Sequence, residues 1–281
     1  MLNLVFTHSL GLTAQAQWGP QLGEFAKLGR ITTVDLPGHG GQPFLSLPER
    51  HLESASRLID AATAGPDPAV LIGSNYGAMV AAAYAATHPG AIGALVLVNG
   101  RARVSATSRD AMLARATELR GTQSMHDLAD QVVGRWFTEQ FAHEHAAYVD
   151  VLRRVLADQD PAGYAEASRW VACADLRQEL ERIEVPTLAV SARADTSFAD
   201  GGLMDVLARV ENVWFRPIRG AHLAAQESAA EFYAAVSVFL RGLPGGTAIS
   251  RASDGVPATA EVSPHTAQLV GAPLTSERIE E

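Results

Sequence analysis

The chain has 281 residues, 47% of them hydrophobic, which is long enough for one large α/β domain with a sizeable core. Its formal net charge of −9 at pH 7 argues against nucleic acid and an anionic membrane as partners, because the field would repel both, and favours a small-molecule ligand. The single cysteine, Cys173, excludes an internal disulfide and any multi-cysteine metal site, which is typical of a cytoplasmic protein.

Short β-rich runs bounded by turns predict six strands, with helical patterns between most of them. This alternation favours a mostly parallel, doubly wound sheet covered on both faces. The run ALVLVN at 94–99 is nearly all apolar, as a strand buried on both faces requires, so we expect it in the centre of the sheet. The predicted strands are 2–7, 30–35, 69–72, 94–99, 187–191 and 213–218.

One interval interrupts the alternation. Residues 101–184 contain stretches such as DAMLARATELR and AAYVDVLRRVLA, whose apolar residues recur at helical spacing, and we expect a helical cap inserted into the core. The core then comprises 1–100 and 185–243 and ends in a helix over 229–241. Residues 244–281 are rich in small and polar residues and lack aromatics, so we expect a mostly disordered tail.

The stretch LIGSNYG at 71–77 has the spacing of a nucleophile elbow, in which a strand ends in Gly73, turns through one exposed residue and enters a helix at Gly77. The exposed position holds Asn75. Shifting the turn so that Ser74 becomes the nucleophile would put Ile72 and Tyr76 where the sharp turn tolerates only small residues. We therefore expect Ser74 to point elsewhere.

Two further segments supply an acid and a base. Asp195 follows the strand TLAVS, and His222 follows the strand VWFRPI, in the chain order elbow, acid, histidine. An Asp that accepts the Nδ1 proton of His222 would orient the ring and leave Nε2 as a base above Asn75. The catalytic candidates are therefore Asn75, His222 and Asp195.

Backbone groups are the candidates for binding a developing oxyanion. The segment HSLG at 8–11 follows the first strand, and we expect the N–H groups of Leu10 and Tyr76 to form the oxyanion hole. Ser9, Trp136 and Trp170 are the candidate substrate-binding residues, although both tryptophans also fit the core of the cap.

Two other residue types fit less specific roles. His39, within DLPGHGG, is expected to be a structural turn residue rather than a base. Arg135 and Arg177 are candidate carboxylate anchors, although most arginines lie on the surface.

The segments THSLGL, VDLPGHG, LIGSNYGAMVAAAYAATHPGAIGALVLVNG and GAHLAAQE resemble the α/β-hydrolase fold family. The phrases ADQVVGRWFTEQF, DPAGYAEASRWVACADLRQEL and RIEVPTLAVSARAD resemble the 3-oxoadipate enol-lactonases, and the likeness runs from about residue 2 to 240. The resemblance implies hydrolysis of a small enol-lactone in aromatic breakdown, without metal or cofactor. It also implies a set of roles: nucleophilic serine at Asn75, acid at Asp195, histidine at His222, oxyanion donors at Leu10 and Tyr76.

An asparagine at the elbow leaves four hypotheses, because its amide nitrogen is a poor nucleophile and the covalent ester route should be lost. In the first, His222 activates a water directly and Asn75 holds that water or the substrate carbonyl. In the second, His222 moves a proton while the N–H pair stabilises an enolate, as in an isomerase, lyase or cyclase.

The third hypothesis makes Asn75 a stand-in for an aspartate nucleophile of the epoxide hydrolase or dehalogenase type. The fourth is a pseudoenzyme that binds a small molecule or a partner. We favour an enzyme acting on a small lactone, ester or enol-type acid, with homo-oligomer formation left open.

Overall fold

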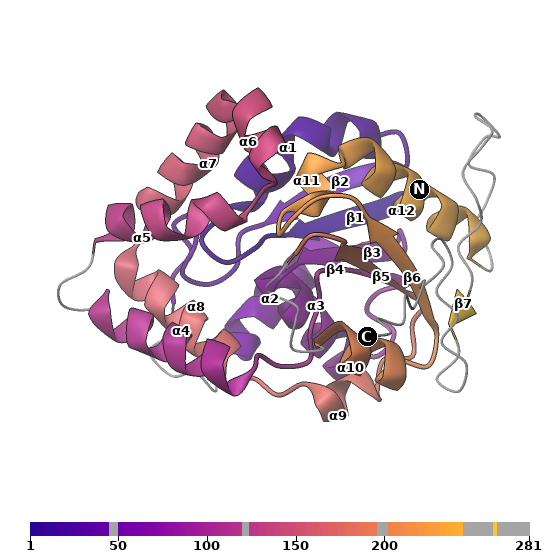
Figure 1. Ribbon diagram of the computed structural model, residues 1–281. Coiled ribbons are helices and arrows are strands. Elements are labelled where there is room, and N and C mark those ends of the chain that lie inside the picture. Colours follow the sequence, from indigo (N-terminus) through magenta and orange to yellow (C-terminus); the bar gives the residue numbers. More distant parts are fainter. Residues whose placement is uncertain (45–49, 120–123, 196–201, 244–260, 263–281) are drawn as a thin grey trace, which may run out of the picture.

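The computed structural model describes residues 1–44, 50–119, 124–195, 202–243 and 261–262 (Figure 1). The tail expected to be disordered, 244–281, lies outside the described residues except for 261–262, so its disorder stays a prediction. Among the described residues, no helix combines the length and apolar character needed to cross a membrane. The same residues contain no cluster of three or more His, Cys, Asp or Glu side chains suited to a metal ion.

The described residues form one sheet in the order β2-β1-β3-β4-β5-β6-β7. The first six strands are parallel to their neighbours, and β7 is antiparallel to β6. All six predicted strands are present, with ends that differ by no more than two residues, and β4 is central as its composition predicts. The strands are β1 Leu2–Thr7, β2 Gly29–Val34, β3 Ala69–Ser74, β4 Ala94–Val98, β5 Thr187–Ala192, β6 Val213–Ile218 and β7 Glu261–Val262.

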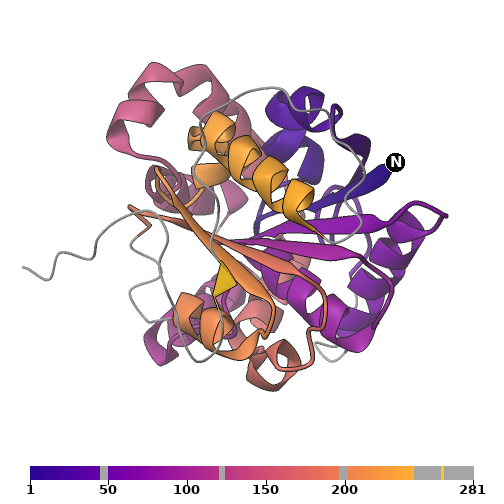
Figure 2. The same cartoon turned by 90° about the vertical axis from the view of Figure 1, so that its right-hand side faces the viewer.

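Helices cover both faces of this sheet (Figure 2). Successive strand side chains point to opposite faces, so Val5 packs in one core layer and Leu4 and Phe6 in the other. The layer that includes Val5 is completed by α2 His51–Thr63, α3 Tyr76–Thr87, α9 Arg177–Leu180 and α10 Gly202–Arg209. The opposite layer is completed by α1 Ala14–Phe25, α11 Ala224–Glu227 and α12 Ala229–Gly242.

The helix α3 is apolar on all sides, and every residue from Tyr76 to Ala85 is buried. A helix of this kind belongs in the centre of a core rather than at its surface. Its N-terminus is therefore rigidly held where β3 ends.

The segment between β4 and β5 is helical, as its spacing predicts. Its helices α4 to α8 gather on one side of the sheet (Figure 1) and share an apolar cluster with Leu12 and Leu223 of the core. The short α9 also falls within 101–184, but it packs into the core beneath α3. The elements here are α4 Ala106–Glu118, α5 Met125–Val132, the turn η2 Val133–Arg135, α6 Glu139–Glu144, α7 Ala146–Ala157 and α8 Pro161–Cys173.

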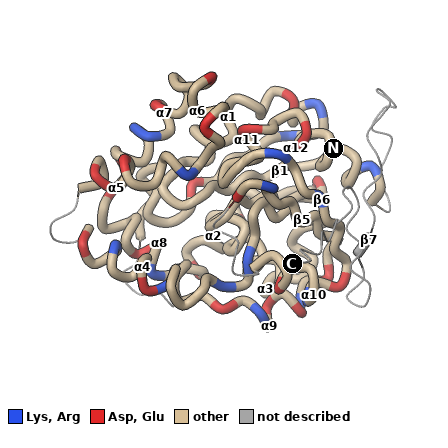
Figure 3. The backbone as a smooth tube through the Cα atoms, in the orientation of Figure 1, with Lys and Arg blue, Asp and Glu red and all other residues tan. Residues whose placement is uncertain are grey.

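The helix α8 rests directly on the core backbone. An added Cβ at Gly163 would lie 2.7 Å from the carbonyl oxygen of Gly38, so only glycine allows this approach. Apolar packing and this close backbone approach both hold the cap against the core. Residues with charges of both signs are interspersed along the described chain (Figure 3).

Candidate active site

The turn between β3 and α3 is centred on Asn75. Its φ of 51° and ψ of −107° lie in a region that residues other than glycine rarely occupy. The turn is held on both sides, because Asn75 N–H donates to the Val98 carbonyl at 2.8 Å and Met79 N–H donates to the Asn75 carbonyl at 3.1 Å. Strained backbone of this kind is concentrated at functional sites.

Two glycines make this turn sterically feasible. A Cβ at Gly73 would lie 2.4 Å from the Gly77 carbonyl oxygen, and one at Gly77 would lie 2.7 Å from the His8 carbonyl oxygen. Both contacts are with backbone, which cannot move aside cheaply. The chain therefore turns at Asn75 as the spacing of LIGSNYG predicts.

The neighbouring Ser74 faces away from this position. It is 1% exposed, and its hydroxyl accepts a hydrogen bond of 3.0 Å from Ser9 Oγ. Ser74 does not line the cavity described below, whereas Asn75 and Ser9 do. Asn75 thus occupies the position of a nucleophile.

The predicted acid and base are in contact. His222 Nδ1 lies 2.9 Å from Asp195 Oδ2, and the Asp195 side chain is only 3% exposed. An ionised carboxylate only accepts hydrogen bonds, so Nδ1 carries the hydrogen and the basic lone pair of His222 is on Nε2. The pair has the arrangement of an oriented general base.

The side chain of Asn99 also contacts this pair, although sequence reasoning assigned it no role. Its Nδ2 donates to Asp195 Oδ2 at 3.2 Å and to the His222 carbonyl at 2.9 Å. A polar residue that follows an apolar central strand and precedes Gly100 was the available signal, because functional residues gather at the carboxyl ends of parallel strands.

The two expected oxyanion donors lie on either side of this turn. Within the described residues, neither Leu10 N–H nor Tyr76 N–H donates a hydrogen bond. Their neighbours do: Gly11 N–H donates to His39 Nε2 at 2.9 Å and Gly77 N–H donates to the His8 carbonyl at 3.0 Å. These neighbouring hydrogen bonds hold the backbone around Leu10 and Tyr76 in place. The N–H groups of Leu10 and Tyr76 therefore remain available for a ligand oxygen.

Three histidines are buried behind the turn. Burial lowers the pKa of His8 to about 4 and that of His51 to about 4, while burial and the nearby His8 lower the pKa of His39 to about 3. His51 Nε2 lies 2.6 Å from the Tyr76 hydroxyl. These neutral rings form hydrogen bonds with the backbone and side chains around the turn. His39 therefore has the structural role that its turn context predicts.

A cavity of about 360 Å³ brings most of the predicted site residues together. Trp136 lines it, whereas Trp170 does not: its ring stacks on His51 at 5.3 Å. The side chain of Tyr76 is likewise directed into the core. The predicted site residues that line the cavity are Ser9, Leu10, Asn75, Trp136, Asp195 and His222.

The cavity also contains a group of cationic side chains, from Arg101, Arg115 and Arg135. Burial raises the pKa of Tyr164, and the nearby guanidinium groups of Arg115 and Arg135 oppose that rise. Neither Arg115 nor Arg135 belongs to an ion pair among the residues that the structure describes. Arg177, by contrast, pairs with Asp175 at 2.6 Å on the surface.

The cap is joined to the histidine loop by Glu227, a second contact that sequence reasoning missed. Leu223 N–H donates to the Trp136 carbonyl at 2.8 Å, directly after His222. Glu227 Oε2 accepts from Ala221 N–H at 3.0 Å and from Thr138 N–H at 3.2 Å. The position of the base is therefore linked to the position of the cap.

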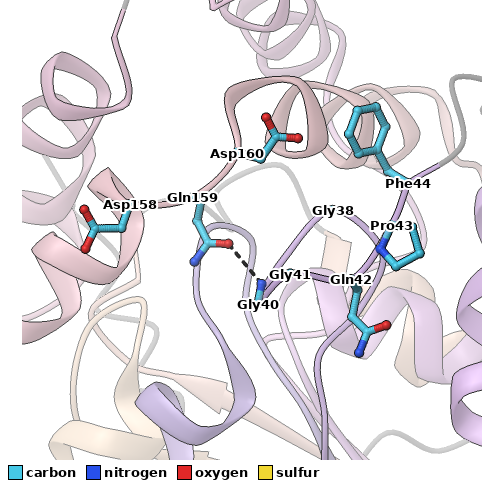
Figure 4. A pocket seen from close by; sticks show the side chains of 9 residues that line it. All are labelled: Gly38, Gly40, Gly41, Gln42, Pro43, Phe44, Asp158, Gln159 and Asp160. Atoms are coloured by element: carbon cyan, nitrogen blue, oxygen red, sulfur yellow. Dashed lines mark hydrogen bonds between the residues drawn. The ribbon is translucent and has the colours of Figure 1, made fainter.

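A second hollow, of about 630 Å³, lies where the loop after β2 meets the start of α8 (Figure 4). Gln159 bridges it by accepting from Gly40 N–H at 3.2 Å. None of the predicted site residues lines this hollow. Because the predicted catalytic residues line the cavity at Asn75, that cavity is the candidate active site.

The chain is similar to known proteins over most of its length. A model of the alpha/beta hydrolase family matches residues 4–246. The 3-oxoadipate enol-lactonase 1 of Acinetobacter baylyi is 27% identical over 244 residues, which cover 85% of this chain and 89% of that enzyme. A pimeloyl-(acyl-carrier protein) methyl ester esterase of Neisseria meningitidis is 29% identical over 207 residues, covering 71% of this chain and 75% of that enzyme.

Similarity extends to solved structures. The crystal structure of the enol-lactonase from Burkholderia xenovorans has a TM-score of 0.75 with this chain at 28% identity, covering 84% of this chain and 90% of that chain. These similarities confirm the predicted fold and the resemblance to enol-lactonases.

Proposed function

Since the chain belongs to the alpha/beta hydrolase family, we propose that it is a cofactor-free enzyme acting on a small lactone, ester or enol-type acid, with His222 as base and water as the attacking group. The observation that carries the proposal is the cavity that Asn75, on the strained turn, lines together with the Asp195–His222 pair. A base is oriented there, while the turn position holds an amide instead of a nucleophilic side chain.

Hydrolysis proceeds in two steps. His222 Nε2 takes a proton from water as the water oxygen bonds to the substrate carbonyl carbon, and the oxyanion is held by the N–H groups of Leu10 and Tyr76. The carbon–oxygen bond to the leaving group then breaks, and His222 returns its proton to that oxygen. Asp195 stabilises the charged imidazole between the two steps.

Asn75 positions the reactants in this scheme. Its amide offers one acceptor and two donor hydrogens, so it can hold the attacking water or the substrate carbonyl beside His222. An alpha/beta hydrolase without its nucleophile keeps the oxyanion hole and binding, which in triad enzymes retain about 10³ to 10⁴-fold catalysis over water. A reactive enol-lactone requires little more.

The arginines that line the cavity support an acidic substrate. Arg115 and Arg135 face the cavity without a carboxylate partner among the described residues, and guanidinium groups bind carboxylates in bidentate fashion. A lactone that carries a carboxylate matches both the Asp195–His222 pair and the arginines that line this cavity. The enol-lactone of 3-oxoadipate, for which the Acinetobacter baylyi relative is named, is the first substrate to test.

A second candidate function follows from Asn75 itself. Without a nucleophile at the turn, the same base and N–H pair suit proton transfer at carbon, with the enolate oxygen held where a tetrahedral oxyanion would otherwise lie. The protein would then be an isomerase, lyase or cyclase on a related acid.

The test is decay of the enol-lactone absorbance with the parent protein, Asn75→Ser and His222→Ala, together with mass spectrometry for an acyl-enzyme. The proposal expects turnover without acyl-enzyme in the parent, loss in His222→Ala, and an acyl-enzyme only in Asn75→Ser. Turnover in Asn75→Ser alone would instead support the proton-transfer function. If none of the three proteins is active, the lactone is excluded as a substrate.

A further inference from the structure

Asn99 occupies an unusual position at the end of β4. It is fully buried and has a φ of 49°, a conformation in which asparagine is several-fold enriched among residues other than glycine. Its own N–H donates to the Val190 carbonyl at 2.8 Å. The strained backbone therefore directs the amide side chain toward the loops that follow β5 and β6.

The amide contacts three groups in two segments of the chain. Its Oδ1 accepts from Ala192 N–H at 2.9 Å at the end of β5. Its Nδ2 donates to Asp195 Oδ2 and to the His222 carbonyl, at 3.2 and 2.9 Å. One buried side chain thus contacts the strand that precedes the acid, the acid itself and the backbone of the base.

We infer that Asn99 is a positioning residue that fixes the orientation of the Asp195 carboxylate and the tautomer of the His222 ring. This inference rests on the proposed function of the pair. Asp195 Oδ2 receives hydrogen bonds from both Asn99 and His222 Nδ1, so the carboxylate cannot rotate without losing one of them. The second bond to the His222 carbonyl fixes the backbone from which the ring extends.

Only an amide satisfies all of these contacts. Alanine would leave Ala192 N–H and the His222 carbonyl without their partner. Aspartate would keep the acceptor for Ala192 N–H, but it would place a second carboxylate beside Asp195, and two such groups in contact cannot both ionise. Asn99 does not line the cavity, so its effect should fall on kcat rather than on KM.

The test compares Asn99→Ala and Asn99→Asp with the control Asn3→Ala. Asn3 is also fully buried and also uses both ends of its amide, donating to the Ala62 carbonyl at 2.8 Å and accepting from Thr32 at 3.2 Å, but it lies on β1 away from the cavity. The readouts are the ¹⁵N NMR signals of the His222 ring, assigned by their loss in His222→Ala, thermal stability, and kcat and KM for the lactone.

We expect Asn99→Ala to show a mixture of His222 tautomers and a kcat lower by about 10²-fold with nearly unchanged KM. Asn3→Ala should lose stability while keeping the parent tautomer and kcat. At low pH the kcat of Asn99→Asp should be higher than that of Asn99→Ala, because a proton shared between the two carboxyl groups lets the new side chain donate a hydrogen bond to Asp195. As pH rises this proton is lost, and the kcat of Asn99→Asp should fall to that of Asn99→Ala.

The inference is overturned if Asn99→Ala retains the parent His222 signals, or if its kcat follows stability in the same way as Asn3→Ala. Should Asn99→Ala not fold, the Asn99→Asp spectrum and pH profile decide in its place. If the parent does not turn over the lactone, the NMR signals decide alone, so the inference and the proposed function can fail separately.

Discussion

At the scale of single residues, the site depends on backbone conformations that one atom can disrupt. Gly73 and Gly77 allow the chain to double back on itself at Asn75, and the adjacent carbonyl oxygens leave no room for a Cβ. The strain is concentrated where the chemistry is proposed, and the surrounding hydrogen bonds maintain it.

Gly73→Ala should lower the free energy of unfolding by about 1 to 3 kcal/mol, because its Cβ would lie 2.4 Å from the Gly77 carbonyl oxygen and must displace the start of α3. Urea unfolding measures this loss. Gly93→Ala is the matched control, since its Cβ would lie 3.6 Å from Pro68 Cβ, an ordinary contact. Equal stability of the two variants would contradict the steric account of the turn.

The residues that local patterns revealed differ physically from those that they missed. The position of Asn75 follows from the Gly73 and Gly77 spacing, and a steric argument from sequence placed Ser74 elsewhere. Asn99 and Glu227 act through hydrogen bonds to segments far along the chain, and no local pattern encodes those partners. Only the folded chain brings these partners together.

At the scale of elements, the periodicity of the sequence predicted the strands and the inserted helices well. Apolar runs and helical spacing are local properties, so the sequence alone predicts β4 and α8 without knowledge of the elements that pack against them. The orientation of an aromatic ring is not a local property: Trp136 lines the cavity, while Trp170 packs on His51. Both lie in amphipathic stretches, and only packing distinguishes them.

Glu227→Ala should loosen the contact between the cap and the histidine loop. The variant loses the acceptor shared by Ala221 N–H and Thr138 N–H, and hydrogen bonds to a charged group contribute about 1.5 to 3 kcal/mol each. We expect a higher KM for the lactone and earlier proteolysis of the cap, because Trp136 and His222 would lose their common support.

Glu231→Ala provides the control for this change. Glu231 also accepts from a backbone N–H, that of Arg219 at 3.2 Å, but no hydrogen bond or ion pair joins it to the described residues of the cap. Limited proteolysis and steady-state kinetics of both variants distinguish a specific link from a general loss of helix stability. A KM that changes equally in the two variants would count against the link.

At the scale of the whole molecule, the two core layers meet the cap at a group of buried aromatic rings. His8, His39 and His51 lie against Tyr76, at centroid distances of 6.1, 5.6 and 5.7 Å. Each histidine is nearly inaccessible, so each must stay neutral for the molecule to stay folded. This group connects the segment at 8–11, the turn at Asn75 and α2.

Stability should therefore fall steeply in mild acid. The pKa of each histidine is near 6.5 in the unfolded chain, whereas burial lowers it to about 4, 3 and 4 for His8, His39 and His51 in the folded protein. Between these values the unfolded chain binds more protons, so the stability present above about pH 6.5 is lost as pH falls. Three such groups approach a slope of about 4 kcal/mol per pH unit below about pH 5.5, where the unfolded histidines are almost fully protonated.

The measurement is the free energy of unfolding in urea from about pH 7 to about pH 5, for the parent, His39→Gln and His143→Gln. Glutamine can still accept from Gly11 N–H but takes up no proton, so His39→Gln should lower the slope by about one third even if it lowers stability at neutral pH. His143 is exposed, and its replacement should leave the slope unchanged. Parallel slopes in all three proteins would mean that carboxylates, rather than the buried rings, govern acid unfolding.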